Sequence, residues 1–212
     1  MCNVIETRKC YLYVLNTMAD WEIGYITAEL KSGRFLLNNE KFEIIPISSK
    51  LESIETMGGI VIEPVETIIN VEFRQNDLLI LPGSDTWMDE NNNQVLDMIP
   101  DLLKRNVIVA AICGATIALA KKGILENLKH TSNDKNFLKM MCPDYAGESF
   151  YIEEPAITDG NLITASGLAP LEFSYQILQK LNVMKKDTLY AWYQLNLTKK
   201  SKWFFSLLES MK

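Results

Sequence analysis

The sequence predicts an α/β protein in which helices cover both faces of a mostly parallel sheet. Residues 77–81 (D-L-L-I-L) and 107–112 (V-I-V-A-A-I) are continuous apolar runs of strand length, as expected for strands buried on both faces. Residues 94–105, which lie between them, carry apolar side chains at the spacing of an amphipathic helix. Buried strands that alternate with amphipathic helices are typical of a parallel sheet.

The other elements continue this alternation. Residues 10–16 form an apolar run rich in strand formers, and Asp20 is the residue expected to cap the helix that follows it. The further expected strands are 42–47 and 162–165, with a turn leading into a short strand or hairpin at 57–62. The further expected helices are 21–30, 114–122 and 170–181. Residues 129–150 have no regular pattern and are expected to be irregular.

The chain is expected to divide into an α/β domain, residues 1–186, and a C-terminal helical arm, residues 187–212. The arm is aromatic and basic, with these residues: Trp192, Trp203, Phe204, Phe205, Lys199, Lys200 and Lys202. We expect the arm to pack on the domain or on a dimer interface. A helix on a membrane surface is the alternative, because such helices separate basic from aromatic residues on two faces.

Composition and charge exclude several classes of function. With 21 Lys and Arg against 27 Asp and Glu, the net charge is -6, so a nucleic-acid partner is not expected. No apolar run approaches the roughly 20 residues that span a bilayer. The polar N-terminus lacks the apolar core of a signal peptide. We therefore expect a cytoplasmic protein without a membrane partner.

The cysteines and the histidine argue against a metal site. The four cysteines, at positions 2, 10, 113 and 142, form no CxxC pair and are expected to be free thiols in a reducing compartment. A closed zinc site needs four nitrogen or sulfur ligands, and His130 is the single histidine of the chain. We expect no metal and no cofactor.

Cys113 lies where the strand at 107–112 meets the following helix with almost no loop. This is the layout of a nucleophile elbow, in which small residues two before and two after the nucleophile avoid a collision across the turn. Ala111 and Ala115 hold these positions, and Gly114 follows the cysteine directly. The helix N-terminus favours the thiolate through its unpaired N–H groups and its dipole. A cysteine that serves only as a small buried side chain is the alternative.

Three motifs in order resemble those of the DJ-1/PfpI family, which is part of the class I glutamine amidotransferase-like superfamily. They are L-P-G-S-D, A-A-I-C-G-A-T and T-A-S-G-L-A-P-L-E-F. The resemblance covers roughly residues 9–183 and leaves the arm unexplained. It implies a flavodoxin-like three-layer sandwich, a homodimer, a small-molecule substrate and a nucleophilic role for Cys113.

The resemblance also implies roles for the residues around the nucleophile. Glu22, in A-D-W-E, matches the acid that hydrogen-bonds the cysteine sulfur and tunes its reactivity, whereas its alternative role is that of an ordinary first-turn helix acid. The L-P-G-S-D loop implies an oxyanion hole, with one donor from Gly83 and Ser84 and another from Gly114. A simple Pro-Gly turn is the alternative for that loop.

The sequence departs from the family at the position of the catalytic base. Many members place a histidine at the end of the strand after the nucleophile helix, and an alignment without gaps puts Asn133 there. His130 lies three residues earlier, and an odd offset on a regular strand points to the opposite face. We therefore favour a packing role for His130 over that of catalytic base. Trp21 and Asp85 are expected to line the pocket.

Without a histidine, a Cys-His-acid hydrolase lacks its proton shuttle. We expect an enzyme, either a hydrolase or a lyase of small molecules, that is glutamine amidotransferase-like or glyoxalase/deglycase-like. Cys113 would form the covalent adduct and Glu22 would act as acid and base. The alternative is a non-catalytic sensor of redox or electrophile stress through Cys113. A glutaminase subunit that feeds a synthetase is disfavoured by Asn133.

Overall fold

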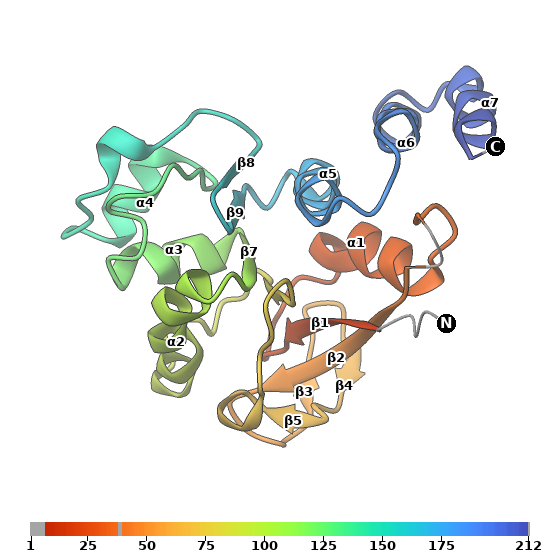
Figure 1. Cartoon of the computed structure of the whole chain (residues 1–212). Helices are drawn as coiled ribbons and strands as arrows, with labels where there is room; N and C mark the ends of the chain where they lie inside the picture. The colour runs from red at the N-terminus through yellow and green to blue at the C-terminus, as the bar shows by residue number, and fades with distance from the viewer. Residues whose placement is uncertain (1–6, 38–39, 212) are drawn as a thin grey trace.

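The computed structural model describes residues 7–37 and 40–211, with a seven-stranded sheet at its centre (Figure 1). Neighbouring strands are parallel except β8 and β9. In spatial order the strands are β5 (Glu66–Thr67), β2 (Phe42–Ser48), β1 (Arg8–Tyr13), β6 (Leu78–Leu81), β7 (Ile108–Ile112), β9 (Leu162–Ala165) and β8 (Ala156–Asp159). A separate antiparallel hairpin contains β3 (Ile54–Glu55) and β4 (Val61–Ile62). The wholly apolar strands β6 and β7 lie in the middle of the sheet and are buried throughout.

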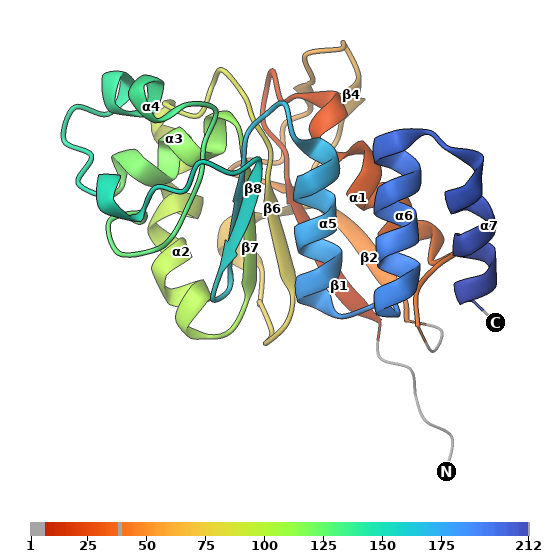
Figure 2. The same cartoon turned by 90° about the horizontal axis from the view of Figure 1, so that it is seen from above.

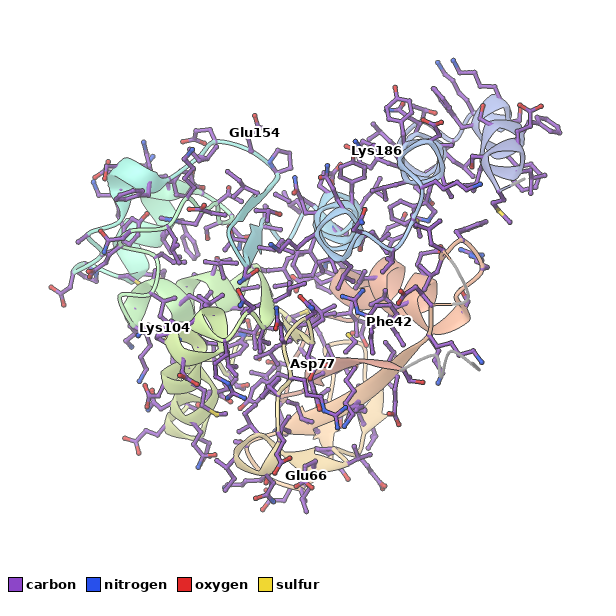
Figure 3. All side chains as sticks on the ribbon, viewed as in Figure 1. Phe42, Glu66, Asp77, Lys104, Glu154 and Lys186 are labelled. Atoms are coloured by element: carbon purple, nitrogen blue, oxygen red, sulfur yellow. The ribbon has the colours of Figure 1, made fainter. Side chains whose placement is uncertain are left out.

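Helices cover both faces of the sheet (Figure 2). One layer contains α1 (Asp20–Ser32) and α5 (Pro170–Leu181), and the other contains α2 (Asn93–Lys104) and α3 (Gly114–Lys121). Side chains fill the space between the sheet and these layers (Figure 3). The predicted flavodoxin-like fold class is therefore confirmed. The shorter helices are α4 (Lys135–Met141) and the 3-10 turns η1 (Ile68–Asn70), η2 (Glu90–Asn92) and η3 (Glu148–Phe150).

The expectation of an irregular segment at 129–150 is wrong in part. This segment contains α4, which begins where the Asp134 carboxylate accepts a hydrogen bond of 2.7 Å from the Phe137 N–H. A capping carboxylate of this kind replaces one hydrogen bond that the first turn lacks. The strand β8, which the sequence analysis did not predict, pairs with β9 across a turn at Gly160. Elements as short as α4 and β8 contain too few residues for a periodic pattern of apolar side chains to be recognised in the sequence.

Asp20 does not cap α1, which corrects the expectation from the sequence. The cap position is Ala19, and Asp20 is the first helical residue. Its carboxylate accepts hydrogen bonds from Thr56 Oγ1 at 2.5 Å and from the Gly58 N–H at 2.7 Å. Both donors belong to the β3–β4 hairpin region, so Asp20 ties the start of α1 to that hairpin.

The arm consists of α6 (Lys186–Thr198) and α7 (Ser201–Ser210), which continue the row begun by α5 (Figures 1 and 2). Trp192 of α6 is buried, and its Nε1–H donates a 3.0 Å hydrogen bond to the buried Glu29 Oε1 on α1. Arg34 Nε donates to Glu29 Oε2 at 3.1 Å, and its guanidinium also pairs with Oε1. The helix α6 is thus packed on the domain, whereas α7 packs on α6.

Candidate active site

Cys113 lies between the last residue of β7 and the first residue of α3, at the carboxyl edge of the sheet. Its backbone has φ 57° and ψ -122°, a conformation that costs a non-glycine residue on the order of 1–3 kcal/mol. The Cys113 N–H is held by the Ala165 carbonyl at 3.0 Å. The chain therefore turns at a single residue, as an elbow requires, and the surrounding structure keeps the strained conformation in place.

Two glycines allow neighbouring backbone to approach the nucleophile. A Cβ atom on Gly114 would stand 2.8 Å from the Ser84 carbonyl oxygen, so the loop after β6 packs directly on the start of α3. A Cβ atom on Gly167 would stand 2.7 Å from Cys113 Sγ and 3.0 Å from Glu22 Oε1. Real Cβ atoms do not approach other atoms this closely. The sulfur and the Glu22 carboxyl therefore lie against the same glycine, whose role the sequence analysis missed.

Glu22 enters the site from the first turn of α1 and is fully buried. Its Oε2 accepts a 2.5 Å hydrogen bond from the Gly83 N–H. Its Oε1 makes no hydrogen bond of ordinary geometry to a described residue, and the weak S–H donor of Cys113 lies beside it. Burial raises the pKa of Glu22 to about 7, against the opposing effect of the bonds from Gly83 and Cys113.

The thiol of Cys113 does not gain the net stabilisation of its anion that the sequence led us to expect. Burial raises its pKa, and the negative charge of Glu22 adds to this effect. The bonds from the Asn133 amide and the Gly114 N–H lower the pKa, so the helix start acts in the expected direction but is outweighed. Because the pKa of the thiol is raised, Cys113 keeps its proton near neutral pH, where Glu22 titrates.

Asn133 is the side chain that contacts the sulfur, at the position where the family histidine was expected. Its Nδ2 donates to Cys113 Sγ at 3.3 Å, and its Oδ1 accepts a 2.8 Å bond from the Gly167 N–H. A backbone N–H can only donate, so the bond from Gly167 fixes which end of the amide faces the sulfur. Asn133 can stabilise a thiolate by donating to it, but it cannot remove a proton.

His130 is buried, and its described hydrogen-bond partners do not include Cys113. Its Nδ1 lies 2.6 Å from the Leu128 carbonyl, and its Nε2 bonds the Tyr145 hydroxyl. The carbonyl can only accept, so Nδ1 carries the proton and Nε2 accepts from Tyr145. Burial lowers the pKa of His130, and the rings of Tyr145 and Tyr151 pack edge-on against it. Its partners all lie outside the group around the sulfur.

The oxyanion-hole expectation needs one change. The Gly83 N–H is already bound to Glu22, so it is not available to a substrate oxygen. The Ser84 N–H donates no hydrogen bond to another residue in the described ranges, and it lies 3.2 Å from the position of a Gly114 Cβ. Ser84 is held in place because its Oγ donates to the Asn16 carbonyl at 2.7 Å. The candidate donors are therefore the N–H groups of Ser84 and Gly114.

The rim of the site is apolar on the side of Gly167. Trp21 is half exposed, and its Nε1–H donates to the Gly167 carbonyl at 3.3 Å. Leu168, which follows Gly167 in the chain and which the sequence analysis did not single out, is 95% exposed. Asp85 is exposed on the loop after β6, where its N–H is bound by Thr17 Oγ1 at 3.1 Å. No described contact joins the Asp85 carboxylate to Cys113, so a pocket role is not evident for it.

Metal-binding clusters, free thiols and membrane-spanning helices were also considered within residues 7–37 and 40–211. No cluster of three or more His, Cys, Asp or Glu side chains suited to a metal ion is found there. Cys10, Cys113 and Cys142 are free thiols, while Cys2 lies outside the described residues. No helix in the same ranges is long and apolar enough to cross a membrane.

Comparison with known proteins agrees with the three motifs and the elbow. The model of the DJ-1/PfpI family matches residues 8–180. The chain belongs to the DJ-1/PfpI family. This family match ends before α6, but relatives extend over the arm as well.

Two Bacillus subtilis (strain 168) proteins are similar to this member of the DJ-1/PfpI family. The uncharacterized protease YoaZ is 45% identical over 208 residues, 98% of this chain and 99% of its own length. The uncharacterized protease YdeA is 33% identical over 82% of this chain and 84% of its own length. The first alignment includes nearly all of the arm, so the arm is shared with that relative.

A solved structure agrees with the fold over the same extent. The thiJ/pfpI family protein from Bacillus anthracis superposes with a TM-score of 0.93 at 48% identity, covering 97% of this chain and 98% of that chain. The DJ-1 superfamily protein Atu0886 from Agrobacterium tumefaciens has a TM-score of 0.78 at 26% identity, covering 91% and 99% of the two chains. The fold thus includes the helices beyond the family match.

Proposed function

We propose that the chain is an enzyme that adds the Cys113 thiolate to small reactive carbonyl compounds and uses Glu22 to move protons. The observation that carries the proposal is the contact of 3.3 Å from Asn133 Nδ2 to Cys113 Sγ. Chemistry that needs a histidine at the sulfur has no base there, whereas addition to a carbonyl needs a thiolate and one proton donor. The buried carboxyl of Glu22 is that donor.

In the first step the Cys113 thiol passes its proton to the Glu22 carboxylate, and Sγ forms a bond to the carbonyl carbon. The electron pair of the C=O bond moves to the oxygen, which takes the proton of Glu22 to give a hemithioacetal. With an α-oxoaldehyde, the Glu22 carboxylate then removes the proton from the former aldehyde carbon. That proton returns to the neighbouring carbonyl carbon, and the hydroxyl proton of the hemithioacetal moves to the ketone oxygen. The product is a 2-hydroxy thioester. Water cleaves the thioester to a 2-hydroxy acid and the free thiol.

The proposed donors serve the same step. Negative charge develops on the carbonyl oxygen, and the N–H groups of Ser84 and Gly114 stand at the loop and helix start beside the sulfur. Each correctly placed donor lowers the barrier by about 3 kcal/mol in comparable sites. Peptide hydrolysis, which the names of the two relatives suggest, needs a group that protonates the leaving amine. Asn133 does not supply one, so we favour carbonyl addition.

Turnover of methylglyoxal by the purified chain tests this proposal. We expect formation of D- or L-lactate that is lost in Cys113→Ala and reduced at least about 100-fold in Glu22→Gln, because the latter variant keeps the shape of the acid without its proton. Cys142→Ala is the matched control, because this thiol is buried away from the site beside the Ile117 carbonyl. Equal turnover by wild type and Cys113→Ala would contradict the proposal.

A second candidate is a redox or electrophile sensor of the cytoplasm that acts without turnover. It is supported by the partial exposure of Cys113 and by the donors from Asn133 and Gly114, which would stabilise an oxidised sulfur anion. Mass spectrometry after peroxide treatment tests this alternative. Selective oxidation of Cys113 in a protein that turns over neither aldehydes nor simple esters would favour the sensor over the enzyme.

A further inference from the structure

A cavity of about 680 Å³ lies at the amino edge of the sheet, at the opposite end of the strands from Cys113. Its described lining comes from the start of β1, the loop before β6, the start of β7, the turn before β9 and the end of α5. These strands run parallel, so their first residues meet at one edge. Ile108, in the cavity, and Cys113 lie about 16 Å apart along β7. The volume is that of a site for a small molecule.

The cavity is basic in a chain that is acidic overall. Four of its described lining residues are cations, namely Arg8, Lys9, Arg74 and Lys180. Asp77 is the single acid among the same residues, so four positive charges and one negative charge give +3, against -6 for the whole chain. A hollow lined mostly by one sign of charge concentrates the electric field and attracts ions of the opposite sign. The lining therefore favours an anion.

The carboxylate of Asp77, a residue labelled in Figure 3, does not balance these cations. Its Oδ2 accepts a 2.8 Å hydrogen bond from the Arg74 N–H, and the Lys9 N–H also donates to this carboxylate. Asp77 is buried, and it is engaged by backbone donors instead of by the charged ends of the cations. Its charge still attracts Arg8 and Lys9, but one negative charge leaves the surplus in place.

The guanidinium of Arg8 is held in position without a ligand. Its Nη1 and Nη2 donate to the carbonyls of Leu181 and Asn76, each at 3.3 Å, and it lies 5.0 Å from the centroid of the Phe42 ring. Its contact with the Glu40 carboxylate is long, at 4.0 Å. Burial lowers the pKa of Arg8 more than the neighbouring carboxylates raise it, so a further anion would stabilise this charge. A guanidinium has five N–H groups, so two carbonyl bonds leave others for a ligand.

We propose that this cavity binds a small molecule that carries at least two negative charges, through Arg8, Lys9 and Lys180. The fixed guanidinium can bind two oxygens of one anionic group side by side, and the two ammonium groups act as mobile point charges. Phosphate esters and polycarboxylates share this chemistry. The side-chain amide of Gln75, which also lines the cavity, offers a donor and an acceptor to an uncharged polar part. A long polyanion is disfavoured, because the acidic body around the cavity repels it.

Isothermal titration calorimetry of the full chain with sodium pyrophosphate and with citrate, at low ionic strength, tests this site. We expect one anion to bind per chain with a Kd below about 1 mM. Lys9→Gln and Lys180→Gln should each weaken binding at least about five-fold, because each removes a charged donor. Lys50→Gln is the matched control. It removes the same charge from an exposed lysine after the carboxyl end of β2, so it should leave binding unchanged.

Two further measurements locate the bound anion and identify its class. Pyrophosphate should leave the rate of Cys113 alkylation by iodoacetamide unchanged, because the cavity is at the other end of β7. Tighter binding of pyrophosphate than of citrate supports a phosphate ester as the ligand, and the reverse supports a polycarboxylate. Lys9→Arg and Lys180→Arg keep the charge and should retain binding, and far-UV circular dichroism checks that all variants are folded.

Three results would overturn the proposal. The first is that wild type binds neither anion. The second is that Lys50→Gln weakens binding as much as Lys9→Gln and Lys180→Gln do, because attraction would then depend on overall charge and not on this cavity. The third is that pyrophosphate protects Cys113 from alkylation, because the anion would then lie at the carboxyl edge of the sheet.

Discussion

Replacing Glu22 with glutamine is expected to make the protein more stable above neutral pH. Burial raises the pKa of Glu22 from an ordinary value of 4.5 to about 7. Between these values the folded chain holds the proton and the unfolded chain releases it, so the free energy of unfolding falls as the pH rises. Below about pH 4.5 this loss of unfolding free energy is absent, and above about pH 7 it is complete. The shift corresponds to about 3 kcal/mol.

A glutamine carries no charge at any of these pH values, and its carbonyl oxygen can still accept from the Gly83 N–H. We therefore expect Glu22→Gln to match wild type near pH 4.5 and to exceed its stability by up to about 3 kcal/mol at pH 8. For a chain of 212 residues this raises Tm by about 6 to 12 °C. The same variant should lose carbonyl turnover, because its amide cannot donate the proton that the adduct needs.

Urea unfolding followed by circular dichroism from pH 4.5 to 8.5 measures this difference. Glu43→Gln, at an exposed acid of β2, is the control and should keep the pH dependence of wild type. If Glu22→Gln shows the same fall in stability with pH as wild type, then ionisation of this carboxyl is not its cause. A raised pKa of Glu22 would then be the wrong explanation for the pH dependence.

Three further changes test the surroundings of the sulfur and the attachment of the arm. Asn133→His should introduce a base, so that the alkylation rate of Cys113 gains a titration step near the ordinary histidine pKa of about 6.5, as iodoacetamide kinetics against pH would reveal. An unchanged profile would show that residue 133 does not set the ionisation of the thiol. Gly167→Ala should slow the same alkylation and lower the free energy of unfolding by about 1–3 kcal/mol, since its methyl group would meet the sulfur; wild-type values in both assays would refute that contact. Trp192→Phe should cost about 1–3 kcal/mol in urea unfolding, because Glu29 loses a buried donor. A loss below a few tenths of a kcal/mol would mean that water replaces the indole.

The candidate residues of the site could be identified from the sequence because most of them stand in short contiguous motifs. The elbow around Cys113 can be recognised because an apolar strand meets a helix without an intervening loop. Asn133 was placed at the sulfur by counting along the chain, and the structure brings its amide there. Residues that follow the carboxyl ends of strands lie at the same edge of a parallel sheet, so the order of the strands and helices along the chain is enough to bring them together.

What could not be predicted depends on contacts between distant segments. The sequence does not reveal that Glu22 takes the N–H of Gly83, which leaves the oxyanion role to Ser84 and Gly114. It also does not reveal that Asp20 bonds the hairpin residues instead of capping its own helix. The net direction of the Cys113 pKa depends on burial, and burial follows from packing of the whole site.

The hydrogen bond between Trp192 and Glu29 shows that the end of the family match and the end of the folded unit differ in this chain. The family match ends at residue 180, before the arm begins. A chain cut there would leave Glu29 and its apolar surroundings on α1 open to water, on the helix that also carries Glu22. The end of the family match is therefore not a limit of folding. For expression or engineering, the smallest unit that keeps the site intact extends through α6.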